Sequence, residues 1–268
     1  PRRSRETRER EEMTSLALSR VRFLPFALGL GTFVAAALII EVMIRAGLIN
    51  KFIVPMPSQI AASFERVILE EHMFDRFVMT FKECLAAAAL LAVFGISIGA
   101  IMHKIDLLRR ATETWVAAFA SAPTVLMYPL FLVIFGRSAT TIVMMGFVAG
   151  IPAVILKTIE GLSSTRRVLI NVGKSFKLTP LQMFTKIQLP SALPTIFTGF
   201  KLGLIFALIN VVGVEFLINF GGLGQLINDL AERYDLPGTY AAICFVILVS
   251  VIFFIVIEWI ERWLTRSE

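Results

Sequence analysis

The chain reads Asn171-Val172-Gly173-Lys174-Ser175-Phe176-Lys177-Leu178-Thr179-Pro180-Leu181 within a polar, basic stretch that covers residues 162–190, and an apolar run opens directly afterwards at Ser191. In a chain this apolar, such a stretch is either a linker between domains or a surface that a partner protein holds. Threonine is a good helix N-cap and proline suits the first helical turn. The sequence therefore predicts one helix up to Leu178 and a second helix from Pro180 to Leu189, and we interpret the pair as a surface for a partner.

The second of these helices is predicted to be amphipathic. It places Leu181, Phe184 and either Ile187 or Gln188 on one side, with Lys186 elsewhere. Pro190 and Pro194 are expected to separate it from the apolar run that follows, because proline interrupts helical hydrogen bonding. A short amphipathic helix with an exposed phenylalanine suits insertion into a groove on another protein.

The composition is that of an integral membrane protein. Hydrophobic residues make up 57% of the 268 positions and charged residues 17%, and the mean hydropathy is +0.79. An ordinary soluble domain is less apolar than this. The net charge of +6 comes from basic residues that flank apolar runs, which argues for membrane topology and against nucleic-acid binding.

Apolar runs predict about six helical spans, since each needs about 20 residues and the backbone in lipid must satisfy its own hydrogen bonds. Arginine and lysine gather on one side of the resulting topology, which places both termini and the 162–190 stretch in the cytoplasm. We expect residues 1–22 to form a cytoplasmic tail, residues 23–268 a transmembrane domain, and a helix capped by Ser58 to lie on the outer membrane surface. The expected spans lie near residues 24–47, 77–103, 115–135, 139–157, 192–217 and 239–263.

Ionisable side chains within the spans are candidates for function, because charge is costly in a bilayer. Glu215 lies inside the fifth span, where it either lines a translocation path or gate, or is a buried acid bonded to nearby backbone or Arg137 to fix the bundle. The two interpretations are equally supported. Glu41, Glu83 and Glu258 lie near span ends and are expected to reach headgroups or basic neighbours.

Other lining residues are proposed from the middle spans. Pro123 and Pro129 are expected to loosen the third span, as in the broken helices of transport sites. Methionine and proline in a span are more often packing residues, so that alternative stays open. Glycine pairs four residues apart predict close helix crossings. The lining candidates are Met127, Tyr128, Met144, Met145 and Asn210, and the glycine pairs are Gly95 with Gly99, Gly146 with Gly150, and Gly199 with Gly203.

Residues 218–238 leave the membrane through a glycine-rich turn and carry leucines beside acidic residues. This segment is either a docking surface for a periplasmic solute-binding protein or a lipid-facing surface helix. The sequence has no Gly-rich phosphate loop of the Walker type, and its two histidines fall on opposite predicted sides. We therefore expect no enzyme activity, no metal and no cofactor in this chain.

The segment Ile187-Gln188-Leu189-Pro190-Ser191-Ala192-Leu193-Pro194, with Thr198-Gly199-Phe200-Lys201 after it, resembles the end of the cytoplasmic "EAA" loop of ABC-importer permeases of the nitrate, taurine and alkanesulfonate group. Glu215 followed by Gly221-Gly222-Leu223-Gly224 also resembles that family. The opening of the loop departs from the pattern, because Asn171 occupies the Glu position, Val172 and Gly173 the two Ala positions, and Lys177 the Gly position.

The resemblance implies an all-α polytopic membrane protein with the type I ABC-importer permease fold, in a bacterial inner membrane. It implies a second permease copy or a different permease, two ATPase subunits that hold ATP and Mg, and a periplasmic solute-binding protein as partners. The substrate would be a nitrate-, sulfonate- or taurine-like anion or a small heteroaromatic nutrient. The residues it assigns to ATPase coupling are Asn171, Gly173, Lys174, Phe176, Lys177, Thr179, Pro180, Phe184, Leu189 and Pro190.

Two rival interpretations belong to other functional classes. A secondary transporter or channel that works alone needs a proton or ion relay, or inverted repeats with paired broken helices. The chain offers one acid of this kind, Glu215, and no persuasive repeat. A passive membrane anchor accounts for the polar loop but not for Glu215 or the helix-breaking prolines. Binding to an ATPase distinguishes an importer subunit from a transporter that works alone. Loss of uptake in Glu215→Gln with assembly intact distinguishes an importer subunit from an anchor.

Overall fold

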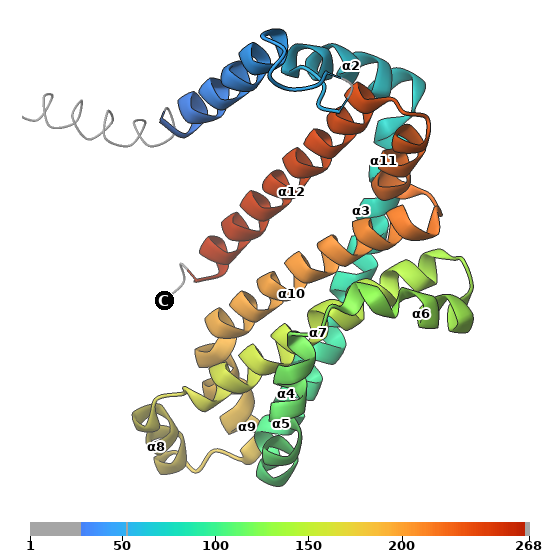
Figure 1. Ribbon diagram of the computed structural model, residues 1–268. Helices are drawn as coiled ribbons and strands as arrows, with labels where there is room; N and C mark the ends of the chain where they lie inside the picture. The colour runs from blue at the N-terminus through green and yellow to red at the C-terminus, as the bar shows by residue number, and fades with distance from the viewer. Residues whose placement is uncertain (1–27, 52, 266–268) are drawn as a thin grey trace, which may run out of the picture. The chain divides into compact units, whose positions relative to one another are not determined.

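The computed structural model describes residues 28–51 and 53–265, and the secondary structure in those ranges is helical with no strand (Figure 1). The chain divides into two compact units, residues 1–63 and residues 64–268. The predicted tail, residues 1–22, lies outside the described residues. The all-helical prediction is confirmed for the described residues.

The first unit contains the apolar helix Leu28–Arg45 and the start of α2, which covers Pro57–Glu70. Glu41 reaches a basic neighbour as expected, since Arg45 Nη2 lies 2.6 Å from its Oε1. Ser58 is not the cap of α2, because that helix already begins at Pro57. Its backbone N–H and its hydroxyl instead donate to the Glu41 carboxylate, at 3.1 and 2.9 Å.

In the second unit, one long helix carries the second expected span. It comprises α3 (Met73–Leu90), a π-helical segment (Leu91–Gly95) and α4 (Ile96–Lys104), and it is continuous over 32 residues. The π segment accommodates an extra residue in the turn, as single-turn π-bulges do. The buried residues Ala87 and Leu91 turn toward Val154 and Leu204 in one core cluster.

The third expected span is broken rather than merely loosened. It consists of α5 (Asp106–Ala120) and a second arm of a 3₁₀ turn (Thr124–Met127) and α6 (Tyr128–Phe135), and the two arms meet at 94°. Pro123 lies at the break and cannot donate a backbone hydrogen bond, while Pro129 sits in the first turn of α6, where no donor is needed. Each proline therefore marks an end of a helix and not a kink within one.

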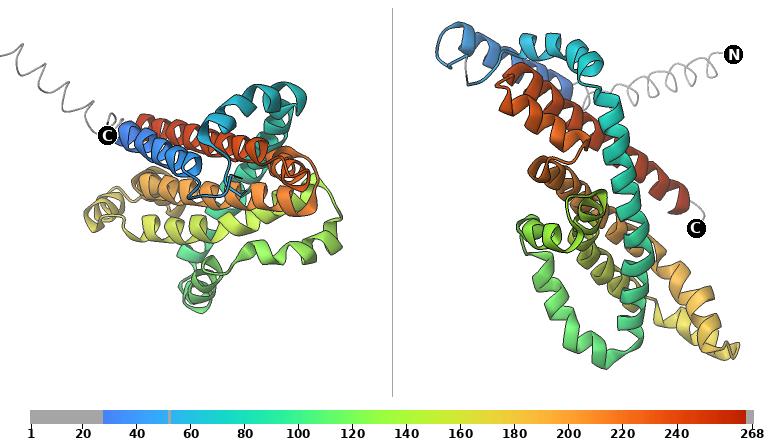
Figure 2. Two further views of the ribbon diagram at one scale, coloured as in Figure 1. Left: turned by 45° about the horizontal axis from the view of Figure 1, so that its top comes forward. Right: turned by 90° about the vertical axis from the view of Figure 1, so that its right-hand side faces the viewer.

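The centre of the second unit is a pair of long helices, α7 (Ala139–Ser163) and α10 (Leu189–Ile218), which lie side by side in both views (Figures 1 and 2). They approach closely at Gly150 and Gly203, where a Cβ on either glycine would collide with the backbone carbonyl of the other. Such contact between backbones is what paired small residues permit in membrane helices. The predicted role of these glycines in a close crossing is confirmed.

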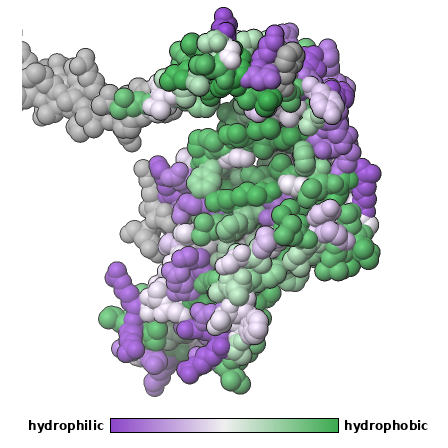
Figure 3. Space-filling model, viewed as in Figure 1, coloured by the Kyte–Doolittle hydropathy of each residue, from purple (hydrophilic) through white to green (hydrophobic). Residues whose placement is uncertain are grey.

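The chain continues through α11 (Gly222–Glu232), which packs against α3, α10 and α12 (Leu236–Thr265). Five helices among the described residues are long and apolar enough to cross a membrane, and the number is six if the bent pair counts as one span. Figure 3 shows apolar surface across the middle of the visible face and hydrophilic residues around the end that carries α8. This distribution is typical of a polytopic membrane protein.

Candidate functional site

Two regions of the second unit gather the residues singled out by the sequence. The first is the corner made by α8 (Arg167–Ser175), α9 (Pro180–Met183) and the π-helical segment Phe184–Gln188 that follows, here termed the α8–α9 corner. The second is the buried contact between α3, the end of α10 and the start of α11. The corner lies at one end of the long helices and α11 at the other (Figure 1).

Helix α8 ends in a Schellman motif. The Leu178 N–H donates to the Gly173 carbonyl at 3.1 Å, and the Lys177 N–H donates to the Lys174 carbonyl at 2.9 Å. Lys177 occupies the left-handed position of the motif, with φ of 52°. That position favours glycine, which has no Cβ to strain the turn. The helix thus ends at Ser175, before the predicted Leu178, and the family's glycine position is the one where the backbone turns left-handed.

The predicted N-cap at Thr179 is confirmed. Its hydroxyl accepts a hydrogen bond from the Gln182 N–H at 3.3 Å, while the Gln182 side chain accepts from the Thr179 N–H at 3.0 Å. This reciprocal pair is a capping box, and it satisfies two backbone donors that a helix start leaves open. Pro180 follows at the first helical position. The two bonds fix the angle at which the chain leaves α8.

The predicted separation between the second short helix and the apolar run is wrong. Residues from Pro180 to Ile218 form one helical rod of 39 residues that includes α9, the π segment and α10. Pro190 sits in the first turn of α10, and Pro194 lies inside it. The π segment just before these prolines changes the local hydrogen-bond register, which lets the rod continue past residues that cannot donate.

Helix α8 rests on this rod at Gly173. The glycine is buried, and a Cβ there would approach the ends of the Ile187 and Met183 side chains to within 2.6 to 2.8 Å. The two elements therefore meet where α8 has no side chain. Glycine replaces the family's alanine at this position, and the Ile187 and Met183 side chains of the facing helix fill the space that the alanine methyl group would occupy.

The exposed phenylalanine of the corner is Phe176 rather than the predicted Phe184. Phe184 is half-buried against Leu162, Ala192 and Ile196, because the continuous helix turns it toward α7 and α10. Phe176 is 77% exposed and Leu181 is 71% exposed. Of the remaining proposed coupling residues, Leu189 and Pro190 are half-buried and the others are exposed, namely Asn171, Lys174, Lys177, Thr179 and Pro180.

The buried region centres on Glu215 of α10, whose side chain is fully enclosed. The Thr80 hydroxyl of α3 donates to Oε1 at 2.7 Å, and the Gly224 N–H of α11 donates to Oε2 at 2.8 Å. The same Thr80 oxygen accepts the Leu223 N–H at 2.9 Å. One carboxyl group thus joins three helices.

The glycines that follow Glu215 are required by this contact. Gly222 has a φ of +75°, and a Cβ on it would collide with the Glu215 carboxyl group. A Cβ on Gly224 would collide with the Val212 carbonyl and the Phe216 amide. The start of α11 therefore packs backbone-first on α10, so the acid and the glycine turn form one unit.

Glu83 contradicts its expected role. It is 4% exposed, and neither carboxyl oxygen has a hydrogen-bond donor among the described residues. It lies one helical turn beyond Thr80 on α3, and its carboxyl group interacts directly with that of Glu215. The expectation that it reaches headgroups or a basic neighbour is wrong, because this face of α3 is turned into the bundle. The sequence offered no local signal for this meeting.

Glu258 behaves as expected. It is the partner of Arg262 on α12, with the guanidinium Nη2 at 2.7 Å from its Oε1. Arg137, by contrast, is not the partner of Glu215. Its guanidinium donates to the backbone carbonyl of Asn219, the residue that ends α10 in a left-handed conformation. The backbone part of the structural interpretation of Glu215 is thus confirmed, and the part that involved Arg137 is wrong.

The other lining candidates lie on, or pack against, the part of α10 that carries Glu215. Asn210 is 8% exposed, with its Oδ1 accepting from the Thr124 hydroxyl at 3.1 Å and its Nδ2 donating to the Phe206 carbonyl at 3.0 Å. Met127, Tyr128 and Met144 pack against one apolar cluster. The buried members of that cluster are Cys84, Phe131, Ile142, Met145, Val211, Val214 and Ile218.

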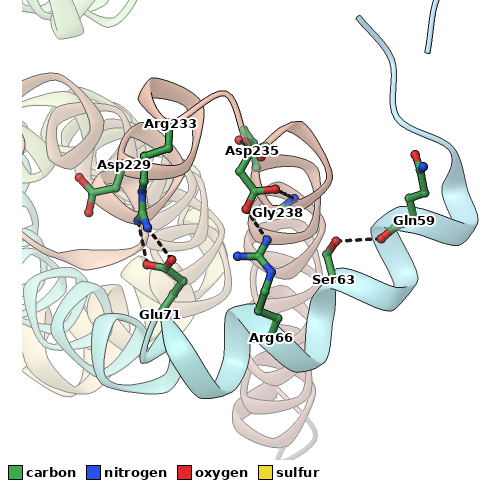
Figure 4. A network of polar contacts seen from close by, with 9 residues as sticks. Gln59, Ser63, Arg66, Glu71, Asp229, Arg233, Asp235 and Gly238 are labelled. Atoms are coloured by element: carbon green, nitrogen blue, oxygen red, sulfur yellow. Dashed lines mark hydrogen bonds and ion pairs between the residues drawn. The ribbon is translucent and has the colours of Figure 1, made fainter. Parts of the chain in front are cut away.

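Ion pairs that the sequence did not predict hold the end of α11 and the turn after it to α2 and to the residue that follows α2 (Figure 4). Arg233 binds Glu71 through two bonds of 2.8 and 2.9 Å, and this lowers the pKa of the Glu71 carboxyl. Arg66 pairs with Asp235, which raises the pKa of the guanidinium. A further pair joins Arg76 to Asp229 at 2.9 Å. Among residues 28–51 and 53–265, no cluster of His, Cys, Asp and Glu suits a metal ion.

Residues 92–266 match the family described as "binding-protein-dependent transport system inner membrane component". The chain is 26% identical to the riboflavin transport system permease protein RibX of Chloroflexus aurantiacus, over 81% of each protein. It is 26% identical to the formylaminopyrimidine transport permease protein ThiX of Halalkalibacterium halodurans, over 77% of this chain and 83% of the relative. It is 21% identical to the taurine transport system permease protein TauC of Escherichia coli K12, over 89% and 88%.

Solved structures share the fold. A structure of the MetNI methionine ABC transporter in inward-facing conformations superposes with a TM-score of 0.63 at 19% identity, covering 72% of this chain and 95% of the other. A crystal structure of an amino acid ABC transporter with histidines gives 0.60 at 15% identity, covering 76% and 97%. The predicted importer-permease fold is confirmed.

Proposed function

The chain belongs to the family of binding-protein-dependent transport system inner membrane components, and from this membership we propose that it is the permease subunit of an ABC importer that binds its ATPases through the α8–α9 corner. In the proposed assembly two ATPase subunits hold ATP and Mg, a second permease completes the pathway, and a solute-binding protein delivers the substrate. The chain itself performs no hydrolysis.

The observation that carries the proposal is the shape of the corner. Phe176 and Leu181 are exposed apolar side chains in the polar α8–α9 corner, where Lys174 and Lys177 are also exposed. Large apolar residues surrounded by polar ones are typical of a protein-binding surface. The Schellman motif and the capping box make the α8–α9 corner rigid, so a partner that binds the corner would move it as one body.

The rod from Pro180 to Ile218 would carry this movement across the bundle. One end of the rod lies in the α8–α9 corner, and the other end places Glu215 against α3 and α11. A displacement of the α8–α9 corner would tilt the rod against α7 and shift the contact of Glu215 with α3 and α11. This is the rigid-element behaviour that switching between two discrete states requires.

The pathway would pass near the apolar cluster that Met127, Tyr128 and Met144 contact, with Asn210 as the polar group beside it. The proposed substrate is a small anion of the nitrate, sulfonate or taurine kind or a small heteroaromatic nutrient. The transport proteins for riboflavin, a formylaminopyrimidine and taurine among the relatives support this range. The corner and both termini would face the bacterial cytoplasm.

The test of coupling is copurification of the chain with ABC ATPase subunits produced in the same cells. Replacing Phe176 and Leu181 together by serine should abolish copurification, because the apolar anchors are lost. The matched control is Tyr234→Ser, which removes an aromatic that is 88% exposed beside α11, at the other end of the bundle. Unchanged copurification of the double variant would contradict the proposal, and uptake by the chain without any ATPase would favour a stand-alone transporter.

Orientation has its own test. With the exposed Cys244 replaced by serine, a cysteine at position 174 should react with a thiol reagent only from the cytoplasmic side, and one at position 234 only from the other side. Reaction of position 174 from outside would contradict the proposal. The altered loop opening further suggests pairing with a different permease, and a purified importer with two copies of this chain and no other permease would exclude that pairing.

A further inference from the structure

We propose that Glu83 and Glu215 form a proton-binding site, in which one proton shared by the two carboxyl groups holds α3 against the α10–α11 turn. This proposal does not depend on which substrate or ATPase the protein binds. Its hydrogen-bond donors are unevenly distributed, because Glu215 accepts from Thr80 and Gly224 whereas both Glu83 oxygens are buried without a donor. A buried polar group without a partner is costly, and a charged one is costlier still.

A shared proton removes this imbalance. Two carboxylates are both acceptors and cannot bond to each other, whereas a protonated Glu83 donates its O–H to Glu215. The Glu215 carboxylate already has two donors and keeps the remaining negative charge. Two ionised carboxyl groups side by side in a low-dielectric interior repel strongly, so the pair is stable with one proton and not with none.

No nearby side-chain cation takes the place of the proton among the described residues. Arg76, toward the start of α3, forms its ion pair with Asp229 of α11, and Arg137 bonds to the Asn219 carbonyl. Lys82 adjoins Glu83 in the sequence, but it is exposed and so lies on a different face of α3. The basic residue of α10 is Lys201, which pairs with Glu261 at 2.9 Å.

The other titratable groups on the elements around the pair are neutral or acidic, apart from Lys157 of α7 and Arg262 of α12, which pair with Glu160 and Glu258. Helix α7 has no ionisable side chain from residue 139 to residue 156, and α6 offers only Tyr128. Cys84 adjoins Glu83 on α3 and is buried. The first half of α12 contributes Tyr240 and Cys244, and α11 contributes the acids Asp229 and Glu232. The contact therefore offers no side-chain cation to balance a second negative charge.

Loss of the proton has a structural consequence. Two negative charges would then face each other between α3 and α10, where Thr80 bridges α3 to both Glu215 and the start of α11. The charges would separate these helices, or draw water into the contact. Deprotonation is thus expected to loosen the turn at Gly221 to Gly224, the segment that joins α10 to α11.

The test is infrared spectroscopy of the full chain purified in lipid nanodiscs. At neutral pH the wild type should show a carbonyl band of a protonated carboxyl group, which disappears at alkaline pH together with a fall in thermal stability. In Glu83→Gln the band should be absent at neutral pH. The amide still donates to Glu215, so this variant should stay folded and lose the alkaline fall in stability.

The control is Glu113→Gln, which replaces an exposed acid that pairs with Arg109 on α5. It should retain both the band and the alkaline fall. Absence of the band from the wild type at neutral pH would overturn the proposal without any variant. So would a band that persists unchanged in Glu83→Gln. Transport is not measured, so failure here leaves the proposed permease function unaffected.

Discussion

The Glu215 side chain and the Gly224 backbone are joined by a hydrogen bond of 2.8 Å, in which the Gly224 N–H donates to Oε2. The bond closes the turn between α10 and α11 onto the helix that precedes it. It depends on a glycine at position 224, since the backbone of α10 occupies the space that a side chain would need.

Replacing Gly224 by alanine should therefore destabilise the protein strongly. The new Cβ would meet the Val212 carbonyl and the Phe216 amide, and backbone atoms cannot move aside as a flexible side chain can. We expect a loss of roughly 3 kcal/mol or more, at the upper end of overpacking costs. Thermal unfolding in detergent measures it. The matched control is Gly213→Ala on α10, whose Cβ would have its nearest contact at 3.8 Å and should be tolerated. Equal effects of the two substitutions would contradict this account.

Lys177→Gly should stabilise the α8–α9 corner. Lys177 has a φ of 52°, and a side chain in the left-handed region costs about 1 kcal/mol relative to glycine. The gain should appear as a higher midpoint of thermal unfolding. Lys174→Gly removes the same charge from within α8 and should instead lower the midpoint, because glycine weakens a helix interior by about 1 kcal/mol. A lower midpoint for Lys177→Gly would show that the lysine side chain itself stabilises the turn.

Thr179→Ala should weaken the same corner by about 1 kcal/mol, because it removes the acceptor for the Gln182 N–H. Thr179→Ser keeps the hydroxyl and should behave like the wild type. Protease sensitivity between Phe176 and Thr179 gives a local measurement, and the alanine variant is expected to be cut faster there. Identical cleavage of the two variants would mean that the capping box does not hold the corner.

The ion pair between Glu71 and Arg233 predicts a dependence on acid pH. Arg233 lowers the pKa of Glu71 in the folded state, so folding favours the carboxylate. The stability from this pair is fully present above the unfolded pKa, which is about 4.3 for glutamate. It is lost as the pH falls through the lower, folded pKa. Because Arg233 is 55% exposed, we expect a contribution of no more than about 1 kcal/mol.

Glu71→Gln tests this dependence by acid titration of the unfolding midpoint. The variant should be less stable than the wild type at neutral pH and should approach it below about pH 4. High salt should reduce the difference, since an exposed pair is screened. A difference that grows as the pH falls would contradict the assigned sign. Glu232→Gln, on α11, is a suitable control because Glu232 contacts the uncharged Asn228.

Much of the fold could be predicted because its signals are local. Apolar length and basic flanks determine the spans, and the threonine and proline at positions 179 and 180 determine a helix start, since each effect acts within a few residues. The small residues along the spans indicated close crossings for the same reason, and Gly150 and Gly203 form one. The identity of the residues that face outward in the corner was predicted less well, because a π segment turned Phe184 inward.

A bundle of membrane helices with a polar, capped corner could be predicted from short stretches of sequence, because hydropathy and helix capping are properties of neighbouring residues. Three features became visible only in the folded molecule: Glu83 meets Glu215, Thr80 bridges to a residue 135 positions away, and the third span bends by 94°. These depend on which faces of distant helices pack together. Packing of that kind follows from the shape of the whole bundle, so no short stretch of sequence encodes it.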